Sequence, residues 1–132
     1  MATEQGLWDL SYTAGASFAS NQFYIVKSTA ADTVTLCTGS SGGINGPRGV
    51  ILNDPLSGES AVVRRLGRTK LNAGGVIAVG AQVTSTTGGQ GLAATSTGEW
   101  CIGRANTAST AAGQVIEVDL LGGWFYTAGA TG

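Results

Sequence analysis

The chain has 132 residues, no histidine and a formal net charge of −1. This length is close to the usual size of a single domain and leaves no room for two ordinary ones. A sequence pI of about 5.1 lacks the cationic excess that neutralising phosphates requires, which argues against nucleic acid as a partner. The missing histidine also excludes Ser-His-Asp and Cys-His catalysis.

Small side chains dominate the composition. Gly, Ala, Ser and Thr make up 67 residues, whereas Val, Ile, Leu and Phe, which fill cores, make up 29. That apolar share lies just above the level of about 20% below which chains tend to be disordered. Because apolar burial must offset conformational entropy, we expect the chain to gain part of its stability by association, as a homo-oligomer or a docked subunit.

The sequence also predicts where the protein is made. No apolar run approaches the roughly 18 residues of a membrane span, and the segment MATEQGLWDL carries an acid where a signal peptide has basic residues. We therefore expect no membrane partner and synthesis in the cytoplasm. Cys37 and Cys101 lie in apolar, strand-like stretches without a C-x-x-C motif, which favours buried free thiols over a disulfide.

The first segment, residues 1–21, stands outside the strand pattern that follows it. Its large side chains, among them Trp8, Leu10, Tyr12 and Phe18, are spaced among small residues. We expect an extended N-terminal arm with apolar anchors, followed by a single β domain over residues 22–132.

The remaining apolar runs are short, rich in Val, Ile and Thr, and punctuated by glycine. This pattern predicts an all-β protein, either a small antiparallel β-barrel or a β-sandwich. The expected strands are 23–28, 33–38, 49–52, 59–71 with a break at Gly67, 76–79, 81–85, 100–105 and 114–121. Turns are expected at residues 53–58, NDPLSG, and at residues 85–91, STTGGQG, where a hairpin tip would lie.

Four of the seven cationic side chains, Arg64, Arg65, Arg68 and Lys70, fall in VVRRLGRTKL, residues 62–71. In a regular strand these side chains project to both faces, so they cannot all decorate one solvent-facing side. Two interpretations stay open: some of the cations pair across subunits or with acids of a partner, or they keep an exposed edge strand soluble.

The tail GGWFYTAGATG contains three consecutive aromatic residues, Trp124, Phe125 and Tyr126. Alternation along a strand would put Phe125 on the face opposite its neighbours, so we expect at least one ring to contact something other than its own core. The alternative is a final strand whose rings cover the end of the barrel.

Among the acids, only Glu117 and Asp119 stand two residues apart, a spacing that puts both carboxylates on one face of a strand. Such a pair could bind a cation or act as acid and base. The outward face of an amphipathic strand is the favoured explanation. We expect no catalytic residue, no metal site and no cofactor.

From residue 49 the chain reads GVILNDPLSGESAVVRRLGRTKLNAGGVIAVGAQV, then a glycine hairpin, EWCIGRA and AAGQVIEVDLL. This order resembles the small capsid cement, or head decoration, proteins of tailed double-stranded DNA phages, over roughly the last two thirds of the chain. In that family a turn leads to a G-E-x-x-x-V strand, a glycine, x-A-G-x-x-I-x-x-G-x-x-V, I-G-x-A and G-x-x-I-x-V. The matching positions are Gly58, Glu59, Val63, Gly67, Ala73, Gly74, Ile77, Gly80, Val83, Ile102, Gly103, Ala105, Gly113, Ile116 and Val118.

The resemblance implies a structural protein of the virion, not an enzyme. Members of the family are β-rich, often trimeric, and sit on the outer capsid surface at three-fold positions, where they bridge major capsid subunits. It implies a homo-oligomer, expected to be a trimer, that is made in the host cytoplasm and binds the major capsid protein. Capsid or subunit contacts are expected at Trp8, Leu10, Tyr12, Arg64, Arg65, Arg68, Lys70, Trp124, Phe125 and Tyr126.

A second function class stays open beside the cement protein. An adhesive β-module of the head-fibre type would bind a receptor or a carbohydrate, with the aromatic tail as its sugar platform.

Overall fold

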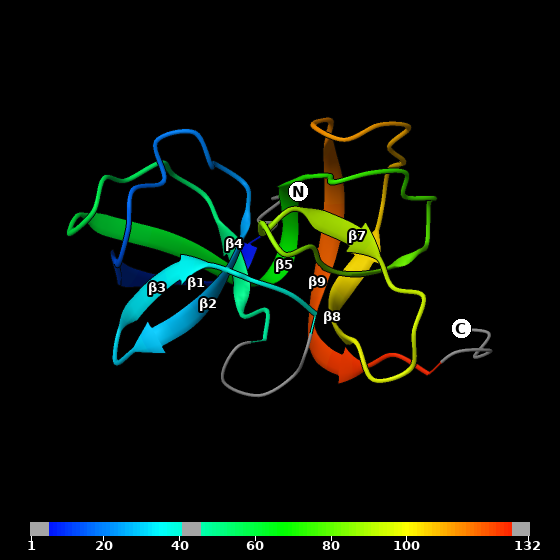
Figure 1. Ribbon diagram of the computed structural model, residues 1–132, viewed down its shortest axis with the longest axis horizontal. Helices are drawn as coiled ribbons and strands as arrows, with labels where there is room; N and C mark the ends of the chain where they lie inside the picture. The colour runs from blue at the N-terminus through cyan, green and yellow to red at the C-terminus, as the bar shows by residue number, and fades with distance from the viewer. Residues whose placement is uncertain (1–5, 41–45, 128–132) are drawn as a thin grey trace.

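The computed structural model describes residues 6–40 and 46–127, and this part of the chain is all-β, as predicted. Its strands form one hydrogen-bonded sheet (Figure 1). They are β1 (Gly6–Ala14), β2 (Ile25–Ala30), β3 (Thr33–Leu36), β4 (Gly49–Ile51), β5 (Ser60–Asn72), β6 (Gln82–Ser85), β7 (Gly91–Ala93), β8 (Trp100–Ala105) and β9 (Val115–Phe125). Among the described residues, no helix is long and apolar enough to cross a membrane.

Five strands close into a small barrel. The hydrogen-bonded order runs β1, β3, β2, β4 and β5, and β1 pairs with β5 to complete the ring. The β1–β3 pair is parallel, whereas the other strand pairs of the barrel are antiparallel. The core of the barrel contains the aromatic ring of Phe18 and small or medium-sized apolar side chains: Ala14, Val26, Val34, Ile51, Ala61 and Val63.

The other strands continue the sheet from β5 through β9, β8 and β6 to β7. A bridge between Ala73, just after β5, and Gly91, at the start of β7, brings the two ends of this half together. Figure 1 shows these strands on one side of β5 and the five-stranded barrel on the other. This half has a core of its own, which includes Leu71, Ala73, Ile77, Val83, Ile102, Ala105, Ile116, Val118 and Leu120.

The two halves share a wall made by β2 and β4. Val26 and Ile51 fill the barrel, whereas their chain neighbours Ile25 and Val50 belong to the second core. All four side chains are fully buried. Successive residues of a strand point to opposite faces. A strand that lies between two cores therefore needs apolar side chains on both faces, as β2 and β4 have here.

The N-terminal segment is a strand of the barrel, which corrects the predicted arm. Residues 6–14 form β1, which pairs with β5 over most of its length and with β3 at its end. Farther along the predicted arm, Phe18 is buried in the barrel core. The physical reason is a period of two: Leu10, Tyr12 and Ala14 face the barrel while the residues between them face outward. Residues 1–5 lie outside the described part of the chain.

Most of the other predicted strands are confirmed with shifted ends, and one is wrong. Residues 76–79 form a loop in which only Ile77 is buried, through an isolated bridge to Ser109. Its neighbours Val76 and Val79 are 71% and 67% exposed. The predicted first strand begins two residues late, at Ile25, because Phe23 has a positive φ of 66°.

Both predicted turns are confirmed, and the second one leads to a strand that was not expected. The hairpin over residues 85–91 joins β6 to β7, with Ser85 opposite Gly91. β7 spans three residues, too few for an alternating pattern to indicate a strand. At the first turn, the Asn53 side chain bonds the main chain of Ser60 and Val62, which holds the two sides of the loop together.

Candidate interaction surface

The four clustered cations lie on β5, which, like β2 and β4, belongs to both halves. β5 pairs with β1 and β4 in the barrel and with β9 in the second half. At Arg64 it has a partner strand on each side, Asp9 on β1 and Val50 on β4. The interpretation of these residues as the cations of an edge strand is therefore wrong.

β5 continues through Gly67, where the sequence predicted a break, but it changes direction there. Gly67 has a φ of +106°, a conformation that L side chains rarely adopt. Just before it, the register between β1 and β5 shifts between the pairs Trp8–Leu66 and Asp9–Arg64, which leaves Arg65 as the extra residue of a β-bulge. The bulge and the glycine together bend β5 from one half into the other.

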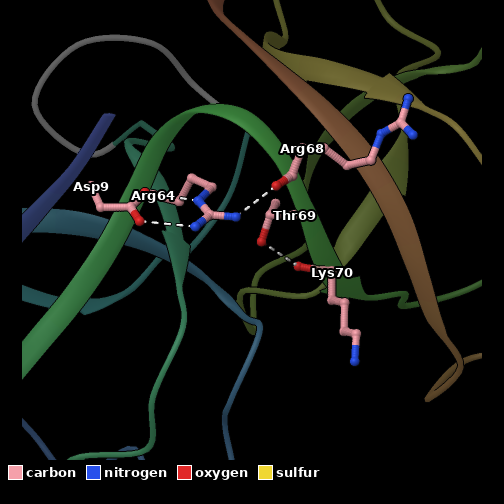
Figure 2. Close-up of polar contacts among 5 residues, drawn as sticks. All are labelled: Asp9, Arg64, Arg68, Thr69 and Lys70. Atoms are coloured by element: carbon pink, nitrogen blue, oxygen red, sulfur yellow. Dashed lines mark hydrogen bonds and ion pairs between the residues drawn. The ribbon is translucent and has the colours of Figure 1, made fainter. Parts of the chain in front are cut away.

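Arg64 spans this bend. Its Nε and Nη2 donate to the two carboxylate oxygens of Asp9 at 2.7 and 2.9 Å, and its Nη1 donates to the main-chain carbonyl of Arg68 at 2.7 Å (Figure 2). The hydrogen bonds from Arg64 hold the pKa of Asp9 below its usual value. Arg64 therefore ties β1 to β5 on one side of the bend and β5 to itself across it.

Beyond the bend, β5 faces the acidic side of β9. Arg68 lies opposite Asp119 and donates to it at 2.8 Å, and Lys70 lies opposite Glu117. The bond to Asp119 raises the pKa of Arg68. Both members of the Arg68–Asp119 pair are about 40% exposed, so the pair adds little to stability. Lys70 also places its Nζ 5.7 Å from the centroid of the Phe23 ring.

Arg65 differs from its neighbours in its contacts. Its guanidinium carbon lies 5.0 Å from the centroid of the Trp8 ring, and its Nη1 lies 3.4 Å from the Tyr12 hydroxyl. Among the described residues it forms no ion pair with a carboxylate. The structure thus brings together three of the residues singled out from the sequence, Trp8, Tyr12 and Arg65, while Leu10 lies opposite Val63 in the barrel wall.

The aromatic tail extends β9 along β8, which matches the interpretation as a final strand. Phe125 lies opposite Trp100, and the two rings meet edge to face with centroids 4.8 Å apart. Trp124, on the other face, donates its indole N–H to the side chain of Gln82. Tyr126 bonds through its main chain to Glu99. Phe125 keeps 58% of its surface exposed, and residues 128–132 of the tail lie outside the described part.

One end of the second half is built from segments that contain no charged residue, although Arg104 reaches it from β8 and donates to the carbonyl of Gly80 at 3.1 Å. The sequence holds no Asp, Glu, Lys or Arg in residues 71–98 or 105–116. The two segments lie side by side, because Ile77 bridges Ser109, and Gly80 donates to the carbonyl of Ala105. We call this region the uncharged end; its most exposed apolar side chains are Val76, Val79 and Val115.

The remaining candidates for chemistry have structural roles in the described residues. Glu117 and Asp119 lie on the outward face of β9 while Ile116, Val118 and Leu120 are buried, which confirms the amphipathic interpretation. The described residues contain no cluster of three or more potential metal ligands. Cys37 and Cys101 are buried and form no disulfide, as predicted.

Comparison with models of known protein families finds a match for this all-β chain. The profile of the phage cement protein family matches residues 2–120. The chain belongs to this family. It is therefore a structural protein of the phage head, associated with the capsid, and the resemblance noted in its turns and apolar positions is confirmed.

A solved phage protein shares the fold of this cement-family chain. The head fibre gp8.5 N base of bacteriophage phi29 superimposes with a TM-score of 0.67 and 16% sequence identity, over 86% of this chain and 93% of the phage protein. At this identity the likeness concerns the fold. No curated protein matches the sequence.

Sequence reasoning found the cations of this cement-family chain but missed their partners. Asp9 was hidden in the segment assigned to an arm, so its pairing with Arg64 could not be anticipated. For Asp119 the sequence does carry a signal: it alternates with apolar residues along the strand, which predicts that it faces outward. The Cα register of β5 on β9, which places Arg68 beside it, follows from the fold and has no local signal in the sequence.

Proposed function

We propose that this protein binds the outer surface of the phage head and bridges neighbouring major capsid subunits, stabilising the expanded shell. The observation that carries the proposal is the cement-family match over residues 2–120. The fold supports it, because two cores joined through shared strands give a body that can transmit force between contacts on its different sides.

The proposed mechanism is clamping by mass action. A capsomer held by a bound clamp must lose the contacts of the clamp before it can leave the lattice, so binding adds to the stability of the shell. Many weak sites that act together can give a large total effect. The protein would be made in the host cytoplasm and join the head from outside.

We also propose that the protein acts as a homo-oligomer, with a trimer expected. The uncharged end supports self-association, because its two segments contribute no charged side chain of their own to a contact between copies. Val76 and Val79 would supply the apolar contact, since both protrude from a loop whose only buried side chain, Ile77, anchors it to the second core.

The testing experiment measures the molar ratio of this chain to the major capsid protein in purified particles, by quantitative mass spectrometry. A ratio near one to one, which trimers at every three-fold position would produce, is the expected result. Particles that lack the protein should lose DNA at a lower temperature than complete particles. A chain absent from particles would contradict the proposal.

A second candidate function is the base of a head fibre, or another adhesive module of the head. Its support is the fold shared with the head fibre gp8.5 N base of phage phi29. The exposed ring of Phe125, stacked edge-on against Trp100, would then be available to a receptor or a sugar. Copy number separates the two functions, because a fibre base need not saturate the lattice.

A further inference from the structure

Four residues at the bend of β5, two of them exposed and two half-buried, form one surface, which we call the junction patch: Trp8, Arg65, Leu66 and Leu121. On β5, Leu66 lies opposite Trp8 of β1 and opposite Leu121 of β9. Directly opposed residues of antiparallel strands project from the same face, so three apolar side chains form a row across three strands. Trp8 is 47% exposed and Leu121 is 53% exposed, so the row is accessible from solvent.

Arg65 gives this patch a positive charge. The other two arginines of β5, Arg64 and Arg68, each bind a carboxylate of the same chain. Arg65, by contrast, contacts the Trp8 ring and the Tyr12 hydroxyl, and no carboxylate among the described residues. These contacts hold the planar guanidinium beside the apolar row, and within the described part of the chain they engage only its Nη1 as a hydrogen-bond donor. A fork of this shape is suited to bind a carboxylate with two hydrogen bonds.

We propose that the junction patch is the surface that binds the shell, and that its partner is an acidic segment of the major capsid protein. A shell Asp or Glu side chain binds Arg65, and an apolar side chain beside it packs on Trp8, Leu66 and Leu121. This inference rests on the proposed function and adds to it the contact surface and the chemistry of the partner. The orientation of Arg65 against Trp8 before binding reduces the entropy lost when the contact forms.

A second copy of this chain fits the patch less well, because it has few acids to offer. Within the described residues, five of the seven acids already accept hydrogen bonds from their own chain. They are Asp9, Glu59, Glu99, Glu117 and Asp119. Charge complementarity therefore favours a different protein as the occupant.

The experiment measures binding to empty expanded heads of the parent phage, assembled without this protein, by co-sedimentation at several salt concentrations. Arg65→Gln removes the charge, and Leu121→Asp places a carboxylate in the exposed part of the apolar row. Lys27→Gln is the matched control, because it removes one cation from β2, where Lys27 bonds the Thr38 hydroxyl. Thermal unfolding of each variant verifies the fold, and Leu121→Asp decides the outcome if Arg65→Gln is unstable.

The expected result is that Arg65→Gln and Leu121→Asp each weaken binding by about tenfold or more, while Lys27→Gln binds as wild type does. The dependence of affinity on salt should also be smaller for Arg65→Gln. Wild-type affinity in both patch variants would overturn the inference and leave the proposed function intact. A reduced oligomeric state with unchanged shell binding would overturn it in favour of a contact between copies. If wild type itself fails to bind the heads, the proposed function fails, and this inference fails with it.

Discussion

The Nη1 of Arg64 donates to the main-chain carbonyl of Arg68 at 2.7 Å, across the bend that Gly67 makes in β5. The same guanidinium holds Asp9 of β1 with its other two donor groups. One side chain thus fixes both the closure of the barrel and the direction in which β5 leaves it. In Figure 2 the arch of β5 passes over this contact. Arg64, which the sequence analysis predicts as a contact residue for the capsid or another subunit, therefore also stabilises the fold of its own chain.

Replacing Arg64 by lysine should reduce stability although the charge is kept. Lysine cannot reach two carboxylate oxygens and a carbonyl at once, because its ammonium lacks the planar fork. We expect the free energy of unfolding to fall by about 1–2 kcal/mol. Urea denaturation is the measurement. Arg68→Lys is the control, since its exposed pair with Asp119 should change stability by less than about 0.5 kcal/mol. Equal losses in the two variants would contradict the bracing role of Arg64.

Low pH should weaken the ion pair between Arg64 and Asp9. The pKa of Asp9 lies below its ordinary value of 3.8, chiefly because Arg64 donates hydrogen bonds to the charged carboxylate. A carboxyl with a depressed folded pKa contributes stability above its unfolded pKa and loses it as pH falls through the folded pKa. The difference in free energy of unfolding between wild type and Asp9→Asn should therefore shrink as pH falls from about 5 to about 2. Denaturation curves across this range test the expectation, which two parallel pH profiles would disprove.

The sequence predicted the class of fold because the dominant signal, short Val, Ile and Thr runs between turn residues, is local. It failed at residues 76–79, where an apolar run that looks like a strand is a loop. The failure has a physical reason: Ile77 enters the core while Val76 and Val79 are exposed, and the local pattern does not distinguish such a loop from a strand. The arm was misjudged for a related reason, since Trp8 and Leu10 gain their strand partner only when β5 is present beside them.

The sequence predicted which residues belong to the candidate surface, but not how each of them is paired. Arg64 and Arg65 are adjacent and chemically identical, yet one is bound to Asp9 and the other lies on Trp8. A one-residue bulge in β5 separates their surroundings. Bulges depend on the pairing of strands that are distant in sequence, so nothing in VVRRLGRTKL indicates which arginine is available to a partner.

Gly103 should tolerate no side chain. A Cβ at this position on β8 would collide with the main-chain carbonyl of Asp119 on β9, which cannot move without breaking the ladder. We expect Gly103→Ala to lower the free energy of unfolding by about 3 kcal/mol. Gly75→Ala is the matched control, because a Cβ there meets nothing within 4 Å. Thermal and urea unfolding of both variants provide the comparison, and similar stabilities would show that β8 and β9 are not held this close.

The thiol of Cys101 should be inert in the folded protein. Burial raises its pKa from 9.0 to about 11, so little thiolate is present at neutral pH. A thiol reagent at pH 8 should label Cys101 only when the protein unfolds, and Cys37, also buried, should behave alike. The raised pKa also means that the unfolded thiol ionises first above about pH 9, so its contribution to stability declines as pH rises through that range. Rapid labelling of a native thiol, followed by mass spectrometry, would contradict this.

The uncharged end should control self-association without controlling the fold. Val76 and Val79 are 71% and 67% exposed, so a Val76→Asp, Val79→Asp variant should change the free energy of unfolding by no more than about 0.5 kcal/mol. If copies meet through this end, two new carboxylates per chain would repel each other, and the mass measured by sedimentation equilibrium should fall to that of a monomer. Leu56→Asp, at an exposed loop position of the barrel half, is the control and should leave the mass unchanged. A double variant with the wild-type mass would place the contact between copies elsewhere on the molecule.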